Sequence, residues 1–201
     1  RGGGIKGLIS IDIADGHLRW EAPFEENDPQ SRGESPTVVD DTVYVGHQQT
    51  VYALDTSDGS ERWSFETDGE VRSSPTVNSG TLYVGSDDGH LYALNTSSGT
   101  EKWSIDTGGE VASSPTVVND SVFVGSLSFD EDIYAVNSAN GDIKWTFATG
   151  NTVSSSPVVV DGVLYIGSRD TNVYAIETGV NESSNGSRVR LQTLNHISGS
   201  V

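Results

Sequence analysis

A segment of about 40 residues repeats along the chain, and this periodicity restricts the fold more than any other feature of the sequence. Full copies open on a Ser-Pro pair, and successive prolines are 39, 40 and 42 residues apart; they are Pro36, Pro75, Pro115 and Pro157. A turn glycine also recurs four positions before a tryptophan. The glycines are Gly16, Gly59, Gly99 and Gly141, and the tryptophans are Trp20, Trp63, Trp103 and Trp145. Repeats of this length bury their apolar faces against the next copy.

Each copy divides into four short runs of β-branched and aromatic residues, separated by turn pairs such as Asp58-Gly59. No stretch shows a sustained helical period, which excludes helical repeats. The second and third runs (43–45 and 51–54 in one copy) are apolar on both faces, as in a sheet covered on both sides. The fourth run (62–66) alternates, as in a strand that contacts water. We therefore expect an all-β fold, a β-propeller of four-stranded antiparallel blades with the tryptophans between neighbouring blades.

The repeat sets the expected organisation of the chain. We predict repeats over residues 1–178, with a partial blade at 1–22, full blades at 35–66, 74–106 and 114–148, and a last blade from 156. Residues 179–201 are expected to form a polar loop and a C-terminal strand or tail.

About four to five blades therefore lie in this chain, and several assemblies remain open. Seven or eight blades form a ring if further blades precede Arg1 or come from a second chain, and five blades form a ring if the chain closes on itself. The larger ring is favoured, because an isolated third strand at the start of the chain would leave unpaired backbone groups.

The repeat resembles the PQQ-type (quinoprotein) β-propeller repeat. The stretch from Leu82 to Asn95, followed by Gly99 and Trp103, carries the resemblance. The same docking pattern of alanine, acidic or amide residue, turn glycine and tryptophan occurs in the copies that end at Trp63 and Trp145. In the first copy, Ser10 stands at the position where alanine is usual. A WD-type propeller is a poorer match, since no tryptophan is followed by aspartate.

The resemblance implies two classes of function. Some relatives are alcohol or sugar dehydrogenases that bind pyrroloquinoline quinone and calcium, and many others bind no cofactor and act outside the cytoplasm as scaffolds or binding proteins. The adjacent cysteines that contact the quinone in several of the enzymes have no counterpart here, because the chain has no cysteine. No motif in this sequence matches the catalytic aspartate of these dehydrogenases.

The net charge of the chain limits which kinds of molecule it can bind. The chain has 29 acidic and 11 basic side chains and a net charge of -18, so it would repel nucleic acid. The acidic surface resembles that of proteins from salt-loving archaea, where concentrated salt screens the repulsion, although an acidic mesophile protein is the alternative. No apolar run is long enough to span a membrane.

Two connections are longer than their counterparts, residues 21–34 and 127–132, and an up-and-down blade places both on the same face. Loops on a rigid scaffold often carry binding, so this face is the candidate partner-binding site. Its candidate residues are Phe24, Glu25, Glu26, Asp28, Phe129, Asp130, Glu131 and Asp132. The carboxylates offer oxygen ligands for calcium but lack EF-hand spacing, and we interpret them as solvated surface. The phenylalanines either anchor a partner or fold back onto their own blades.

The sequence thus favours a non-catalytic propeller outside the cytoplasm or at the cell surface that binds a protein or another ligand through one loop-bearing face. No catalytic, cofactor-binding or metal-binding residue is assigned, and no cofactor is expected. The alternative is part of a dehydrogenase that uses pyrroloquinoline quinone and calcium.

Overall fold

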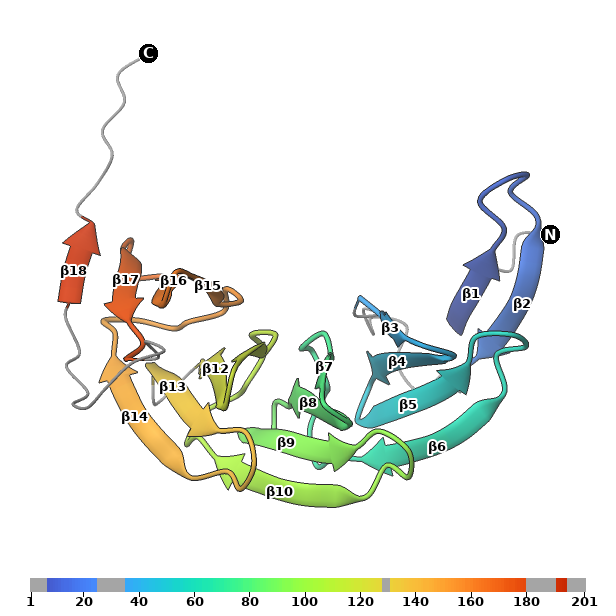
Figure 1. The fold of residues 1–201 in the computed structure, drawn as a ribbon, viewed down its shortest axis with the longest axis horizontal. Helices are drawn as coiled ribbons and strands as arrows, with labels where there is room; N and C mark the ends of the chain where they lie inside the picture. The colour runs from blue at the N-terminus through green and yellow to red at the C-terminus, as the bar shows by residue number, and fades with distance from the viewer. Residues whose placement is uncertain (1–6, 25–34, 128–130, 180–190, 195–201) are drawn as a thin grey trace, which may run out of the picture.

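The computed structural model describes residues 7–24, 35–127, 131–179 and 191–194, and over these residues the chain contains strands and turns but no helix. The strands form five antiparallel sheets that follow one another around a curved arc (Figure 1). Four sheets have four strands, paired in sequence order, and the first has two. The prediction of an all-β propeller of four-stranded blades is confirmed.

The blades are numbered in chain order. Blade 1 contains β1 (Gly7–Ile11) and β2 (Leu18–Pro23). Blade 2 contains β3 (Thr37–Val39), β4 (Thr42–His47), β5 (Thr50–Asp55) and β6 (Glu61–Glu66). Blade 3 contains β7 (Thr76–Asn78), β8 (Thr81–Gly85), β9 (His90–Asn95) and β10 (Glu101–Asp106). Blade 4 contains β11 (Thr116–Val118), β12 (Ser121–Gly125), β13 (Asp132–Asn137) and β14 (Ile143–Ala148). Blade 5 contains β15 (Val158–Val160), β16 (Val163–Gly167), β17 (Val173–Glu177) and β18 (Leu191–Leu194).

The short first strands of the full blades line the inside of the arc, and the fourth strands lie on its outside (Figure 1). Neighbouring inner strands are joined by side-chain hydrogen bonds. The hydroxyl of Thr37 donates to the carbonyl of Pro75 at 2.5 Å, and Thr76 and Thr116 donate to the corresponding prolines at 2.6 and 2.5 Å. The Ser-Pro-Thr motif therefore links each full blade to the next beside the axis.

The apolar core lies between blades rather than within one blade. Val51, Ala53 and Trp63 of blade 2 pack with Leu82, Val84, Tyr92 and Leu94 of blade 3, and all are buried. Similar clusters join blades 3 and 4 and blades 4 and 5. A blade is only one sheet thick, so it needs a neighbour on each face to remove its apolar side chains from water.

The arc is open in this structure. Blade 1 stands at one end and blade 5 at the other, well separated in Figure 1, so the five sheets do not close a ring by themselves. Apolar side chains are exposed on both end sheets, including Ile11 (49% exposed) in β1 and Val158 (56%) in β15. Nothing in the described ranges forms a helix that is long and apolar enough to cross a membrane.

Candidate functional site

The tryptophans of blades 1 to 3 lie in the seams between blades. Trp20, Trp63 and Trp103 are at most 9% exposed. The indole N–H of Trp20 donates to the carbonyl of Thr56 at 2.8 Å, and Trp63 and Trp103 donate to Thr96 and Ser138 at 2.8 and 3.2 Å. Each acceptor lies in the turn between the third and fourth strands of the next blade. The tryptophan therefore buries its ring and still satisfies its only donor.

The turn glycines make room for these rings. Gly59 has φ near 75°, and a Cβ there would lie 2.6 Å from a ring carbon of Trp20. A Cβ at Gly99 would lie 2.6 Å from Trp63 and one at Gly141 3.0 Å from Trp103, so each glycine makes room for the tryptophan of the preceding blade. Gly16 has no such neighbour, because no earlier blade faces it in this structure. Trp145 is only half-buried, and the matching turn position of blade 5, residue 181, lies outside the described residues.

The connections between blades and the loops between second and third strands share one face. In the seam of blades 2 and 3, the N–H of Val71 donates to the carbonyl of Gln48 at 2.6 Å, and the N–H of Asp87 donates to that of Glu70 at 2.8 Å. The same pair of backbone hydrogen bonds recurs in the next two seams. This loop-bearing face is therefore a continuous, hydrogen-bonded surface over blades 2 to 5.

Both longer connections begin on that face, but most of their candidate residues lie outside the described part of the chain. These are Glu25, Glu26, Asp28, Phe129 and Asp130. Glu131 is half-exposed with φ near 59°, and its carbonyl accepts a hydrogen bond from the hydroxyl of Thr149 at 2.7 Å. Asp132 opens β13. This hydrogen bond therefore joins the end of the long connection 127–132 to the start of the connection between blades 4 and 5, at Thr149.

Charged side chains on the loop-bearing face pair with each other. Arg72 lies 2.8 Å from Glu70 and 3.0 Å from Asp87. Burial raises the pKa of Asp87, and the positive charge of Arg72 offsets only part of this increase. Across the residues that the structure describes, no three His, Asp or Glu side chains come together in a way that could hold a metal ion.

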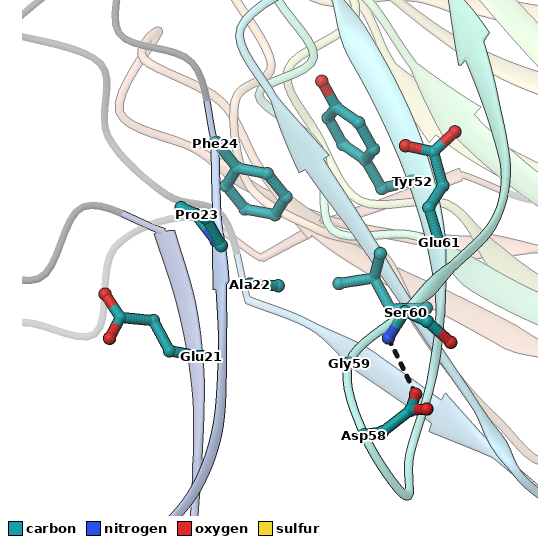
Figure 2. A pocket seen from close by; sticks show the side chains of 10 residues that line it. Glu21, Ala22, Pro23, Phe24, Tyr52, Asp58, Gly59, Ser60 and Glu61 are labelled. Carbon is teal, nitrogen blue, oxygen red and sulfur yellow. Dashed lines mark hydrogen bonds between the residues drawn. The ribbon is translucent and has the colours of Figure 1, made fainter.

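A groove of about 350 Å³ lies between blades 1 and 2 on the outer side of the arc (Figure 2). Ala22 and Leu54, which belong to one buried cluster, give it an apolar base. The rings of Phe24 and Tyr52 lie beside each other at one end (Figure 2). The remaining lining residues are Glu21, Pro23, Asp58, Gly59, Ser60 and Glu61. The lining thus combines an apolar base with acidic groups.

The groove exists because one side chain is small. In the next seam Phe65 occupies the corresponding position of the fourth strand, and its ring meets that of Tyr92 edge-on with centroids 5.4 Å apart. Phe147 meets Tyr174 in the same way at 5.2 Å. Blade 1 has Ala22 at this position, so a groove stays open over Ala22 although another ring, Phe24, lies against Tyr52. The repeat alignment contained this difference, and the sequence reasoning did not use it.

Phe24 occupies part of the seam beside the groove. It stacks on His47 and on Tyr52 with ring centroids 4.7 and 4.8 Å away, both from blade 2. Burial lowers the pKa of His47 below its usual 6.5. Phe24 therefore packs across the seam onto the following blade and does not fold back onto its own.

The described residues offer few groups that could hold a quinone and its calcium ion. Pyrroloquinoline quinone carries carboxylates that need cationic or N–H partners. The inner strands carry serine, proline, threonine and valine; on the loop-bearing face Arg72 is paired with Glu70 and Asp87, and Arg169 is exposed. No set of carboxylates in the described segments could hold calcium either.

These features define the class of protein: a β-propeller of PQQ-type blades joined through tryptophan docking in the seams. The chain belongs to the family described as outer membrane protein assembly factor BamB, whose sequence pattern matches residues 6–125 and 77–190. The crystal structure of BamB from Moraxella catarrhalis matches with a TM-score of 0.72 and 20% identity, over 85% of this chain and 54% of that one.

Other similar proteins differ in function. The quinohemoprotein alcohol dehydrogenase ADHIIG from Pseudomonas putida HK5 matches with a TM-score of 0.65 and 21% identity, over 72% of this chain and 32% of that one. Serine/threonine-protein kinase AfsK of Streptomyces griseus is 34% identical over 65 residues, 32% of this chain and 8% of the kinase. The chain thus spans about half of the matched BamB structure and much less of the other two.

Proposed function

We propose that this chain is part of a non-catalytic propeller that binds a partner protein through its loop-bearing face, outside the cytoplasm or at the cell surface. The observation that carries the proposal is the repeated pair of backbone hydrogen bonds that joins the connections between blades to the loops of both adjoining blades. This arrangement holds a broad surface rigid, and rigid surfaces bind with little loss of conformational entropy.

The family supports this proposal. Its description, an outer membrane protein assembly factor, fits a protein that binds other proteins outside the cytoplasm. The acidic side chains on the same face favour a partner with a basic surface, since complementary charge steers association. A net charge of -18 also fits a protein adapted to concentrated salt, as in salt-loving archaea.

The test compares charge removal on the two faces of the arc. Glu26→Gln with Glu131→Gln neutralises two charges in the long connections of the loop-bearing face. Asp40→Asn with Asp161→Asn removes two charges from turns of the opposite face, where φ is near 53° and 49°, a conformation that asparagine tolerates. Partners are identified by chemical cross-linking in the source cells, and their affinities for the purified variants are then measured.

We expect the first variant to bind the cross-linked partner about tenfold more weakly and the second to bind it normally. Equal weakening by both variants, or by neither, would contradict the proposal. Uptake of pyrroloquinoline quinone and calcium with dye-linked oxidation of alcohols or sugars would favour the dehydrogenase alternative instead.

A further inference from the structure

We propose that the groove between blades 1 and 2 binds the side chain of an arginine from a basic segment of a partner protein. Three properties of the groove support this inference: its size, its aromatic wall and its unbalanced negative charge. The groove shares only Phe24 with the candidate residues of the loop-bearing face, so the inference does not depend on the function proposed above.

The size of the groove matches one large side chain. Its volume of about 350 Å³ falls at the lower end of the range for small-molecule pockets. In the seam of blades 2 and 3 the same space is filled by Phe65 of the protein itself. Because Ala22 replaces that ring in blade 1, space remains over Ala22 and Leu54, next to the stacked rings of Phe24 and Tyr52, and this space fits a flat group on an apolar stem.

The negative charge comes from Glu61 and Asp58. Glu61 opens β6 opposite Leu54, whose side chain packs with Trp20 and Ala22 of blade 1, so Glu61 lies on the sheet face that borders the groove. Its Oε1 accepts a hydrogen bond from the hydroxyl of Ser64 at 2.8 Å. One carboxylate oxygen of Asp58 accepts a hydrogen bond from the N–H of Ser60 at 2.9 Å (Figure 2).

None of the ten residues that line the groove is Lys, Arg or His, so the lining itself carries no positive charge. The nearest cation in sequence, Arg62, lies 2.8 Å from Asp41 and 2.7 Å from Asp55 and is already paired. Glu21 belongs to the lining, but Figure 2 shows its carboxylate directed away from the groove. The groove therefore favours a ligand that brings its own cation.

Arginine combines the required features in one side chain. Its planar guanidinium stacks on aromatic faces, donates two parallel hydrogen bonds to a carboxylate and sits on an apolar stem. The stem would lie over Ala22 and Leu54 and the guanidinium beside Tyr52 and Glu61. The net charge of -18 attracts basic segments to the surface.

Further blades would leave the groove open. A blade placed before blade 1 would contact the sheet face that carries Ile9 and Ile11, which are 37% and 49% exposed. Ala22 lies on the opposite face of that sheet, buried against blade 2. The groove is thus a property of the seam between blades 1 and 2 in a longer propeller as well.

Calorimetric titration with Nα-acetyl-arginine amide tests the inference, with Nα-acetyl-citrulline amide as the neutral probe of the same shape. We expect the arginine probe to bind at one site and at least about tenfold more tightly than the citrulline probe, since one charged pair contributes about that much. Equal affinity for the two probes, or no binding of either, would overturn the proposal. Free arginine that binds far more tightly than the blocked probe would identify a metabolite site instead of a protein-binding site.

Two substitutions and one matched control locate the site. Ala22→Phe should fill the groove as Phe65 fills the next seam and abolish binding, with the melting temperature unchanged or higher. Glu61→Gln should weaken binding about tenfold. Glu101→Gln is the control, because Glu101 makes the same hydrogen bond with Ser104 at 2.8 Å in a seam that is already filled.

The control variant should bind the arginine probe as the unmodified protein does. Binding that survives Ala22→Phe, or that Glu101→Gln weakens as much as Glu61→Gln, would refute the assignment to this groove. The Glu26→Gln, Glu131→Gln variant should retain full arginine binding, so failure of the proposed function and failure of this inference are separable.

Discussion

At the scale of single residues, one tryptophan differs from the other three. Trp63 and Trp103 each share their acceptor carbonyl with a tyrosine hydroxyl, from Tyr44 at 3.3 Å and Tyr83 at 3.1 Å. Trp145 packs beside Phe123, which has no hydroxyl, and is only half-buried. Tryptophan at the same repeat position therefore contributes differently to stability in different blades.

We expect Trp103→Ala to lower the free energy of unfolding by about 3–5 kcal/mol, the usual range for truncating a buried aromatic ring. Trp145→Ala should lower it by only about 1–2 kcal/mol, because less apolar surface is buried there. Urea unfolding of both variants measures the difference. Equal losses would show that the two seams are packed equally well.

A second residue-scale prediction concerns acid stability. Burial works to raise the pKa of Asp170, but hydrogen bonds from the Tyr174 hydroxyl and from the N–H groups of Gly150 and Asn172 outweigh it and lower the pKa from 3.8 to about 2. The unfolded chain thus binds this proton more readily, so the stability contributed by Asp170 is complete above about pH 4 and is lost as the pH falls towards 2.

We expect Asp170→Asn to flatten the fall of the melting temperature over this interval, because asparagine cannot titrate. Melting curves at several pH values between 4 and 2 measure the effect. Asp161→Asn, in a turn of the same blade, is the control and should leave the slope unchanged. An unchanged slope in Asp170→Asn would show that Asp170 adds nothing to acid stability.

At the scale of elements, a glycine at or next to the end of each second strand joins the blade to the connection that follows it. The hydroxyl of Ser73 donates to the carbonyl of Gly85 at 3.0 Å and accepts from its N–H at 2.6 Å, and both residues are buried. Val111 lies against the same glycine from the next connection. The short β8 is therefore fixed from both sides, and the same close contact with a valine explains the glycine at this position in blades 2 to 4.

Gly85→Ala should destabilise the protein by about 1–3 kcal/mol through overpacking. A Cβ at Gly85 would lie 2.4 Å from both a methyl carbon and the carbonyl oxygen of Val111. Gly167, at the same repeat position in blade 5, has no atom nearer than 3.6 Å, so Gly167→Ala should be neutral or stabilising by up to about 1 kcal/mol. Thermal unfolding compares the pair, and equal effects would mean that the seam of blades 3 and 4 relaxes around the added methyl group.

At the scale of the whole molecule, the arc ends in two apolar sheet faces. Ile9, Ile11 and Leu18 are exposed at the blade 1 end, and Val158, Tyr165 and Val173 are exposed at the blade 5 end. Val158 also stands where the inner strands of blades 2 to 4 have the threonine that bonds to the next blade. In the interior seams these faces are covered by a neighbouring blade.

We expect the 201-residue chain to associate with itself in a concentration-dependent way, because apolar sheet faces of this kind are rarely left in water. Ile11→Lys together with Val173→Lys should shift sedimentation towards the monomer. Ile143→Glu, which gives blade 4 the glutamate found at Glu61 and Glu101, is the control and should not. A chain that sediments as a monomer at all concentrations would contradict this prediction.

The sequence alone determined the repeat, the strands and the fold class. A period of about 40 residues with four apolar runs permits few folds, and the recurring glycine and tryptophan identify which residues must meet between copies. These are local or periodic properties, so they can be read from residues such as Gly59 and Trp63 without knowledge of distant contacts.

Three features were decided only by the tertiary structure. They are the pairing of each tryptophan ring with the glycine it packs against, the packing of Phe24 across a seam, and the groove next to Tyr52. The physical reason is that these features depend on pairs of side chains from different blades. Ala22 is an ordinary small residue in its own strand, and its consequence appears only when blade 2 packs against it and no ring fills the space.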